Sequence, residues 1–141
     1  MDFIAHAQKT LTIEQNGIAA ISQQLDDTFN TAIQALLDAI DRNGKIVIAG
    51  VGKNWHIGNK IAATLNSTGS PAAVMHPIEA MHGDFGLLSD SDILIAMSYS
   101  GASEEITALL PPVKRRNIPI IALTADADSP LARHSDLILN I

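Results

Sequence analysis

Five short apolar runs, rich in β-branched residues, recur along the chain from residue 46 onward, and helix-compatible stretches separate them. Each run has the length and composition of a strand that is buried on both faces of a sheet. Strands that alternate with helices predict right-handed βαβ units, so we expect a three-layer α/β/α domain with a mainly parallel sheet. The expected strands are residues 46–49, 72–75, 93–97, 118–123 and 137–139, and the expected helices are about 56–66, 103–116 and a short turn at 129–133.

The first 43 residues have the periodicity of a helix instead. Asp26 or Asp27 is suited to cap a second helix, so we expect a break near residues 22–27. Asn43-Gly44 supplies a residue for the left-handed conformation at which helices commonly end. We therefore expect an N-terminal pair of helices packed on the sheet. The residues expected on one apolar stripe of these helices are Ile18, Ile21, Leu25, Phe29, Ile33, Leu36, Leu37 and Ile40.

The composition fits one domain over residues 1–141, with helices at 1–43 and an α/β core at 44–141. A net charge of −6 argues against a general nucleic-acid binder. The absence of cysteine excludes disulfides, thiolate metal sites and a cysteine nucleophile. No apolar run approaches the ~18 residues of a membrane span, and Met1-Asp2-Phe3 lacks the basic start of a signal peptide. We expect a soluble, cytoplasmic protein with neither nucleic-acid nor membrane partners.

Three loops follow the expected strands on the side where function is expected. In an open parallel sheet, ligands bind beyond the carboxyl ends of the strands. This rule selects residues 50–56, 76–85 and 98–103, which are richer in glycine, hydroxyl and ionisable residues than the strands before them. We expect the functional site to be built from these loops.

The third loop, Ser98-Tyr99-Ser100-Gly101-Ala102-Ser103, joins an apolar run to an expected helix. Backbone N–H groups at the start of a helix form an anion site. Ser98, Ser100 and Ser103 add hydroxyl donors, and Gly101 allows a ligand to approach the backbone closely. The loop therefore favours binding of a phosphate, with ordinary helix capping as the alternative.

The first loop carries Lys53 between glycines, in Gly50-Val51-Gly52-Lys53-Asn54-Trp55-His56-Ile57-Gly58. The dinucleotide fingerprint fails because Trp55 stands where its third glycine is required, and the Walker motif fails because Asn54 follows the lysine. Lys53 is suited to polarise a carbonyl or hydroxyl oxygen of a ligand. The alternative is a solvated surface lysine.

The second loop contains His76, Glu79, His82 and Asp84. The two histidines are six residues apart, so they do not share a helix face as the ligands of a zincin metal site do. We therefore expect no metal here, and proton transfer or hydrogen bonding to a polar ligand instead. His82 is the better candidate because the following Gly83 allows close approach of a substrate.

Taken together, these residues resemble the sugar isomerase (SIS) domain and, within it, the arabinose-5-phosphate isomerases. The resemblance covers nearly the whole chain and is densest from Lys45 to Ala132. The matching motifs are Gly50-Val51-Gly52-Lys53, His56-Ile57-Gly58, Ile61-Ala62-Ala63-Thr64, Ser67-Thr68-Gly69, His76-Pro77, Glu79-Ala80, His82-Gly83-Asp84, Ser98 to Ser103, Leu123-Thr124 and Ser129-Pro130-Leu131-Ala132.

The resemblance implies a five-stranded parallel sheet, phosphosugar binding at the serine loop, and a site shared between the subunits of a homotetramer. It also implies interconversion of D-ribulose 5-phosphate and D-arabinose 5-phosphate through an enediol(ate), without metal or nucleotide cofactor. That step leads to the lipopolysaccharide or capsule sugar Kdo. Lys53, Glu105 and His82 match catalytic or active-site positions of the family, with the base unassigned between Glu105 and His82. Gly52, Ser67, Thr68 and His76 match substrate-binding positions.

Three departures from the family pattern accompany the resemblance. Asn54-Trp55 replaces the usual Ser-Gly after the lysine, so an indole stands where almost no side chain is expected. The family domain continues past Ile141 into a helix-rich segment with a further Glu and His, and many members carry paired CBS modules. We therefore expect the front part of an SIS domain. The alternatives are a sugar-phosphate-binding module without activity, and an isomerase of heptose or hexulose phosphates, which the His76-Pro77 and His82-Gly83-Asp84 combination disfavours.

Overall fold

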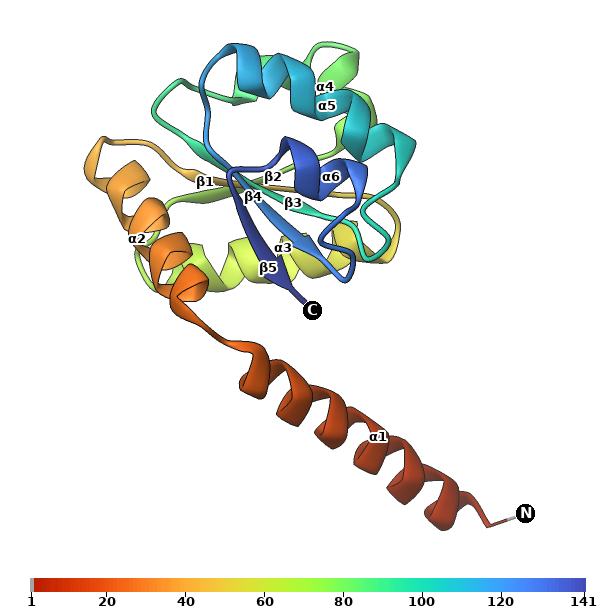
Figure 1. The fold of residues 1–141 in the computed structure, drawn as a ribbon. Coiled ribbons are helices and arrows are strands. Elements are labelled where there is room, and N and C mark those ends of the chain that lie inside the picture. The colour runs from red at the N-terminus through yellow and green to blue at the C-terminus, as the bar shows by residue number, and fades with distance from the viewer. Residues whose placement is uncertain (1) are drawn as a thin grey trace.

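The computed structural model describes residues 2–141, which form one sheet, flanking helices and a projecting N-terminal helix (Figure 1). The strands are β1 (Ile46–Gly50), β2 (Ala72–Met75), β3 (Ile93–Met97), β4 (Ile120–Thr124) and β5 (Leu137–Asn140). The helices are α1 (Phe3–Gln24), α2 (Asp27–Asp41), α3 (Lys53–Ser67), α4 (Pro77–Met81), α5 (Glu104–Arg115) and α6 (Pro130–His134), with a 3-10 helix η1 (Asp84–Leu87).

The sheet confirms the expected five parallel strands. Its order is β2-β1-β3-β4-β5, and every neighbouring pair is parallel. The chain moves from β1 outward to β2 and then crosses to β3 on the other side of β1. The strand order therefore reverses between β1 and β3, and in such sheets this reversal opens the crevice that holds a ligand.

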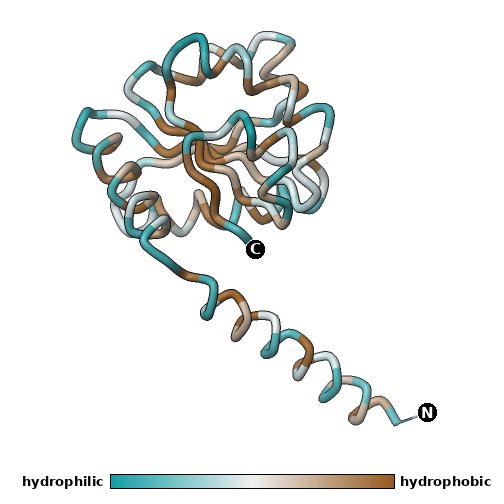
Figure 2. The backbone as a smooth tube through the Cα atoms, in the orientation of Figure 1, coloured by the Kyte–Doolittle hydropathy of each residue, from teal (hydrophilic) through white to brown (hydrophobic). Residues whose placement is uncertain are grey.

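Apolar side chains cover both faces of the sheet, as the continuous apolar runs predicted. On one face, Ile46, Ile48 and Ile93 pack with residues of α2 and α3. On the other face, Leu94 and Ile120 pack with residues of α4, α5 and α6. The helices thus form two layers around the strands (Figure 1), and the hydrophobic colouring of Figure 2 is concentrated on the central strands.

The expected packing of an N-terminal helical pair on the sheet is wrong for α1. The predicted break occurs, since α1 ends at Gln24 and Asp26 caps α2 by accepting a hydrogen bond from the amide of Thr28 at 2.8 Å. The backbone between the two helices is extended, and it directs α1 away from the domain (Figure 1). No residue of α1 is buried, so the apolar stripe is covered only from α2 onward, where Leu36 and Ile40 contact the core.

Other boundaries differ from the sequence expectation. Strand β4 covers Ile120–Thr124 instead of residues 118–123, because Pro119 has no N–H to donate to the sheet. The second loop contains α4 and η1, because Pro77 begins a helical turn that buries Ala80 in the core. Helix α3 begins at Lys53, three residues earlier than expected. The expected end of α2 is confirmed, since Asn43 of the Asn43-Gly44 pair takes the left-handed conformation with a φ of 60°.

Candidate functional site

The loops after β1 and β3 lie next to each other, because their strands are neighbours in the sheet. Gly50 at the end of β1 is in register with Met97 at the end of β3. The side-chain amide of Asn54 donates a hydrogen bond to the Met97 carbonyl oxygen at 3.3 Å, which ties the first turn of α3 to β3. A side chain at Gly50 would lie 2.8 Å from Asn54 Cβ, so a glycine is required for this approach. The first and third sequence-predicted loops are therefore joined at the strand-order reversal.

The serine loop leads into the first turn of α5, as predicted. The Ser98 and Ser103 hydroxyls share a hydrogen bond of 2.9 Å, and the amide of Ala102 donates to the Ser100 hydroxyl at 3.3 Å. Ser103 occupies the N-cap position, but no side chain caps α5. Capping by the Ser103 side chain is therefore not observed, whereas Glu104 and Glu105 in the first turn lie where the helix dipole favours negative charge.

The structure requires glycine at position 101 for a packing reason that the sequence did not reveal. Its φ is +63°, and a side chain there would lie 2.0 Å from the Ser129 hydroxyl and 2.9 Å from the Thr124 hydroxyl. Its amide donates to the Ser98 carbonyl, and its carbonyl accepts from the amide of Leu131. The glycine thus serves the packing of α6 against the loop. This packing fixes the serine loop to the end of β4.

Gly52 and Lys53 start α3 beside the serine loop. Gly52 is the N-cap residue, with a φ of 57° and open space where a side chain would be. Lys53 is exposed. Within residues 2–141 the ion pairs are Lys45–Asp92, Lys114–Asp136 and Arg116–Asp90, and none includes Lys53 or Glu105. Glu105, on the first turn of α5, is also exposed. Within one chain, Lys53 and Glu105 therefore lie at the same edge of the sheet without forming an ion pair.

Trp55 and His76 form one wall of a cavity of about 280 Å³ at the end of β2. Their ring centroids are 5.2 Å apart and the rings meet edge to face at 69°. The Nδ1 atom of His76 is buried without a hydrogen-bond partner among the described residues. Glu79, Asp84 and Leu87 line the cavity with Val74 and Met75. Glu79 and Asp84 belong to the second sequence-predicted loop, whereas Leu87 follows that loop and had no signal in the sequence.

His82 does not line this cavity. It is the C-cap residue of α4, it is exposed, and the next residue, Gly83, has a φ of 141°. The structure therefore places His76 among the cavity walls and leaves His82 on the surface of the same segment. The role of His82 in proton transfer stays a prediction.

The expected substrate contacts of Ser67 and Thr68 do not fit the geometry of one chain. Both lie at the end of α3, and a helix of 15 residues places them about 22 Å from Lys53 at its start. Their hydroxyls donate to the carbonyl of Thr64, at 2.7 and 3.2 Å. They therefore close the C-terminus of α3 at the opposite edge of the sheet.

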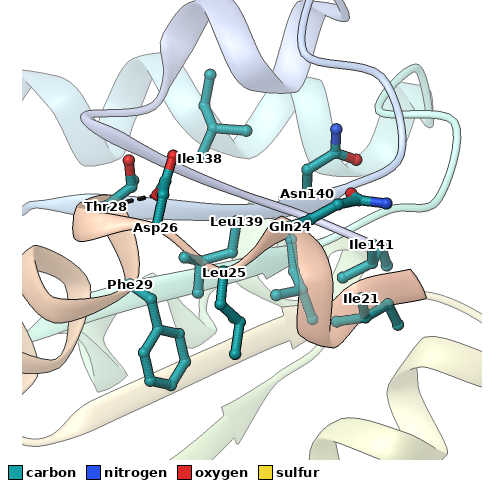
Figure 3. A pocket seen from close by; sticks show the side chains of 11 residues that line it. Ile21, Gln24, Leu25, Asp26, Thr28, Phe29, Ile138, Leu139, Asn140 and Ile141 are labelled. Carbon is teal, nitrogen blue, oxygen red and sulfur yellow. Dashed lines mark hydrogen bonds between the residues drawn. The ribbon is translucent and has the colours of Figure 1, made fainter. Parts of the chain in front are cut away.

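A second cavity, of about 190 Å³, lies between the junction of α1 with α2 and the edge strand β5. Figure 3 shows Ile21, Leu25 and Phe29 beside Leu139 and Ile141, with Asp26 bonded to Thr28. Its walls are mainly apolar, and its single ionisable residue, Asp26, is occupied in capping α2. This groove has the character of a packing surface rather than of a reaction site.

Within residues 2–141, no group of three or more His, Asp or Glu side chains is arranged to hold a metal ion. No helix in this part of the chain has both the length and the apolar character needed to cross a bilayer.

The fold and the site define a doubly wound α/β domain with a serine-rich loop and a helix N-terminus at the reversal of its strand order. The family model of the SIS domain matches residues 39–141, and the chain belongs to this family. It is 41% identical over 140 residues to arabinose 5-phosphate isomerase KdsD of Pseudomonas aeruginosa, and 44% identical over 138 residues to the Francisella tularensis protein of that name. These matches cover 99% and 98% of this chain, but the chain spans only 42% of each relative.

Solved structures with the same fold include two phosphosugar-related proteins. An Escherichia coli CFT073 protein in complex with A5P has a TM-score of 0.84 and 34% identity, over 99% of this chain and 74% of that one. A Bacteroides fragilis protein, described as a phosphosugar isomerase involved in capsule formation, has a TM-score of 0.89 and 36% identity, over 99% and 73% of the two chains.

Proposed function

We propose that this domain binds phosphorylated pentoses and interconverts D-arabinose 5-phosphate and D-ribulose 5-phosphate. The observation that carries the proposal is the meeting of two loops at the strand-order reversal. The Lys53 loop and the uncapped first turn of α5 are held together there by the hydrogen bond from Asn54 to Met97. The names of the KdsD relatives and the A5P complex of the E. coli protein supply the substrate class.

The serine loop is the proposed anchor for the phosphate. The proposed donors are the first amides of α5 and the hydroxyls of Ser98, Ser100 and Ser103, since helix N-termini favour negative charge. The Ser98 and Ser103 hydroxyls bond to each other, so one of their two protons remains to donate to a phosphate. The acidic net charge of the chain does not oppose this binding, because the donors are local and mostly backbone groups. Gly52 contributes open space beside the loop.

The reaction needs one proton to move between adjacent carbons while another moves between their oxygens. A base takes the proton from the carbon beside the carbonyl, and the enediol(ate) that results accepts it back on the other carbon, so no net oxidation occurs. Lys53 is proposed to stabilise the developing charge on the sugar oxygens. Glu105 and His82 are the candidate bases, and Glu105 has an alternative role in orienting Lys53 across a subunit boundary.

A homotetramer is part of the proposal. Helix α1 exposes Ile4, Leu11 and Ile18 to solvent, with exposed fractions of 72%, 58% and 70%. The apolar groove beside β5 is the second open apolar surface (Figure 3). Because a helix with an uncovered apolar stripe gains its stability by packing, a second copy of this chain is the proposed cover. Supply of arabinose 5-phosphate for Kdo, and a cytoplasmic location, stay predictions.

Substitution of Lys53 tests the proposed reaction. With a coupled assay on ribulose 5-phosphate, we expect Lys53→Ala to lower kcat by about 100- to 1,000-fold, as loss of one charge-stabilising donor does. Lys60→Ala, an exposed lysine on the same helix, is the control and should retain full activity. Unchanged isomerisation by Lys53→Ala would refute the role of Lys53. Thermal stabilisation of the unmodified chain by arabinose 5-phosphate without turnover would favour the alternative, a binding module without activity.

A further inference from the structure

Trp55 joins the Lys53 loop to the cavity beside β2, because its side chain forms part of the cavity wall. It lies on the first turn of α3, two residues after Lys53. Its neighbour Asn54 is bonded to the end of β3, so the orientation of this turn is fixed. Its indole is half-buried and meets the His76 ring edge to face. An aromatic pair of this kind is a rigid wall with few accessible rotamers.

The distance between this wall and the phosphate anchor follows from the sheet. The serine loop follows β3 and His76 follows β2, and β1 lies between these two strands. Neighbouring strands are about 4.8 Å apart, so the two ends are separated by about 10 Å. Lys53, which follows β1, lies between them. A sugar phosphate that is anchored at the serine loop and extends toward β2 would pass Lys53 and reach Trp55.

We propose that Trp55, braced against His76, is a specificity-determining residue that limits the site to five-carbon sugar phosphates. The proposal rests on the function proposed above. The indole closes the end of the site opposite the phosphate, and a six- or seven-carbon chain would have to displace it. The cavity on whose wall Trp55 stands supplies the room that a smaller side chain would open. Glu79 and Asp84 on its walls would meet the hydroxyls of the longer sugar.

His76 is the positioning partner of Trp55. Its Nδ1 atom is buried and unpartnered in the described chain, so the ring is held by packing rather than by hydrogen bonds of that nitrogen. A buried polar atom without a partner is costly, and a sugar hydroxyl that reaches it would gain a hydrogen bond. Ligand binding near Trp55 should therefore change the surroundings of the indole.

Trp55 is the single tryptophan of the chain, so its fluorescence reports this wall directly. We expect D-arabinose 5-phosphate to change the emission of the unmodified protein and inorganic phosphate to leave it unchanged, because phosphate alone fills only the serine loop. Equal changes with both ligands would overturn the placement of the sugar against Trp55. Thermal shift, measured in parallel, detects binding that does not change the emission. If the pentose phosphate binds without changing the emission, the placement of the sugar against Trp55 is also overturned.

Three variants test the selectivity. In the unmodified protein, arabinose 5-phosphate should bind at least about tenfold more tightly than glucose 6-phosphate or sedoheptulose 7-phosphate, as expected for a closed pocket. Trp55→Gly should reduce that ratio at least threefold, and Trp55→Phe should retain most of it. Ile57→Ala, on the same helix and not on the cavity wall, is the matched control. If Trp55→Gly does not fold, Trp55→Leu replaces it in the selectivity test. The fluorescence experiment uses the unmodified protein and does not depend on either variant.

The outcomes separate this inference from the proposed function. An unchanged ratio in Trp55→Gly, with pentose phosphate still bound, overturns the role of Trp55 and leaves the proposed function intact. Failure of the unmodified chain to bind any sugar phosphate overturns the proposed function, and the role of Trp55 with it.

Discussion

Asp92 shows how much one residue contributes to the stability of the fold, at the edge of the sheet opposite the candidate site. Its side chain is 1% exposed and accepts hydrogen bonds from Lys45 Nζ at 2.7 Å and from the amides of Lys45 and Ser89 at 2.9 and 2.7 Å. Burial alone raises the pKa of Asp92. The three hydrogen bonds and the charge of Lys45 outweigh burial and hold this pKa below its ordinary value of 3.8. The carboxylate therefore joins the start of β1 to the turn before β3.

Replacement of Asp92 should destabilise the domain. Asp92→Ala leaves buried donors without a partner, so we expect a loss of about 1–3 kcal/mol in the free energy of unfolding at pH 7, measured by urea denaturation. Asp90→Ala is the control, because Asp90 is paired with Arg116 at the surface, and its loss should cost less than about 1 kcal/mol. Equal losses in both variants would contradict this account.

The pH dependence of stability follows from the same residue. Because the folded state lowers the pKa of Asp92, its stabilising contribution is present above the unfolded pKa and is lost as the pH falls through the lower folded pKa. The unmodified protein should therefore lose stability below about pH 4 more steeply than Asp92→Asn. Thermal unfolding between pH 7 and pH 2 measures this, and parallel curves for the two proteins would show that Asp92 does not contribute.

At the scale of elements, α1 and α2 begin in the same way but differ in what they support. Asp2 caps α1 through the amides of Ile4 and Ala5, and Asp26 caps α2 through the amide of Thr28. Helix α2 buries Ala32 and Ala39 against the sheet, whereas α1 buries nothing. A cap therefore contributes to the stability of the core only at α2.

The two caps form a matched pair of variants. Asp26→Ala should lower the free energy of unfolding of the core by about 1 kcal/mol. Asp2→Ala should leave it unchanged and reduce only the helical signal in circular dichroism. A loss of core stability on Asp2→Ala would show that α1 packs on the domain in solution.

At the scale of the whole molecule, the projecting α1 points to assembly. Ile4, Leu11 and Ile18 recur every seven residues and continue to Leu25, which is the spacing of a helix that packs on another helix. Ile13 is also exposed but lies on the opposite side of the helix. The apolar bands along α1 are visible in Figure 2.

Substitutions on the two sides of α1 should therefore differ. Leu11→Ser with Ile18→Ser should reduce the mass of the particle in analytical ultracentrifugation, while Ile13→Ser should not change it. A monomeric unmodified chain, or the same mass in every variant, would contradict assembly through α1.

The sequence by itself determined the layers, the parallel strands and the loops that carry the candidate site. Continuous β-branched runs are stable only when both faces are covered, and alternation with helices leaves one handedness of connection. The runs at 72–75 and 93–97 are therefore strands with the predicted bounds. The serine loop was equally readable, because Ser98 to Ser103 follow a strand and precede a helix.

Only the tertiary structure decided which residues meet. The helix predicted at 56–66 already separates Ser67 and Thr68 from Lys53 by its length, but only the structure shows that their hydroxyls bond to Thr64 at the C-terminal end of α3. It cannot show that Gly101 makes room for Ser129, or that Trp55 rests on His76, because these contacts join distant segments. The same holds for α1: its periodicity predicts a helix with an apolar side, but the extended backbone at Leu25 and Asp26 decides that this side does not face its own sheet.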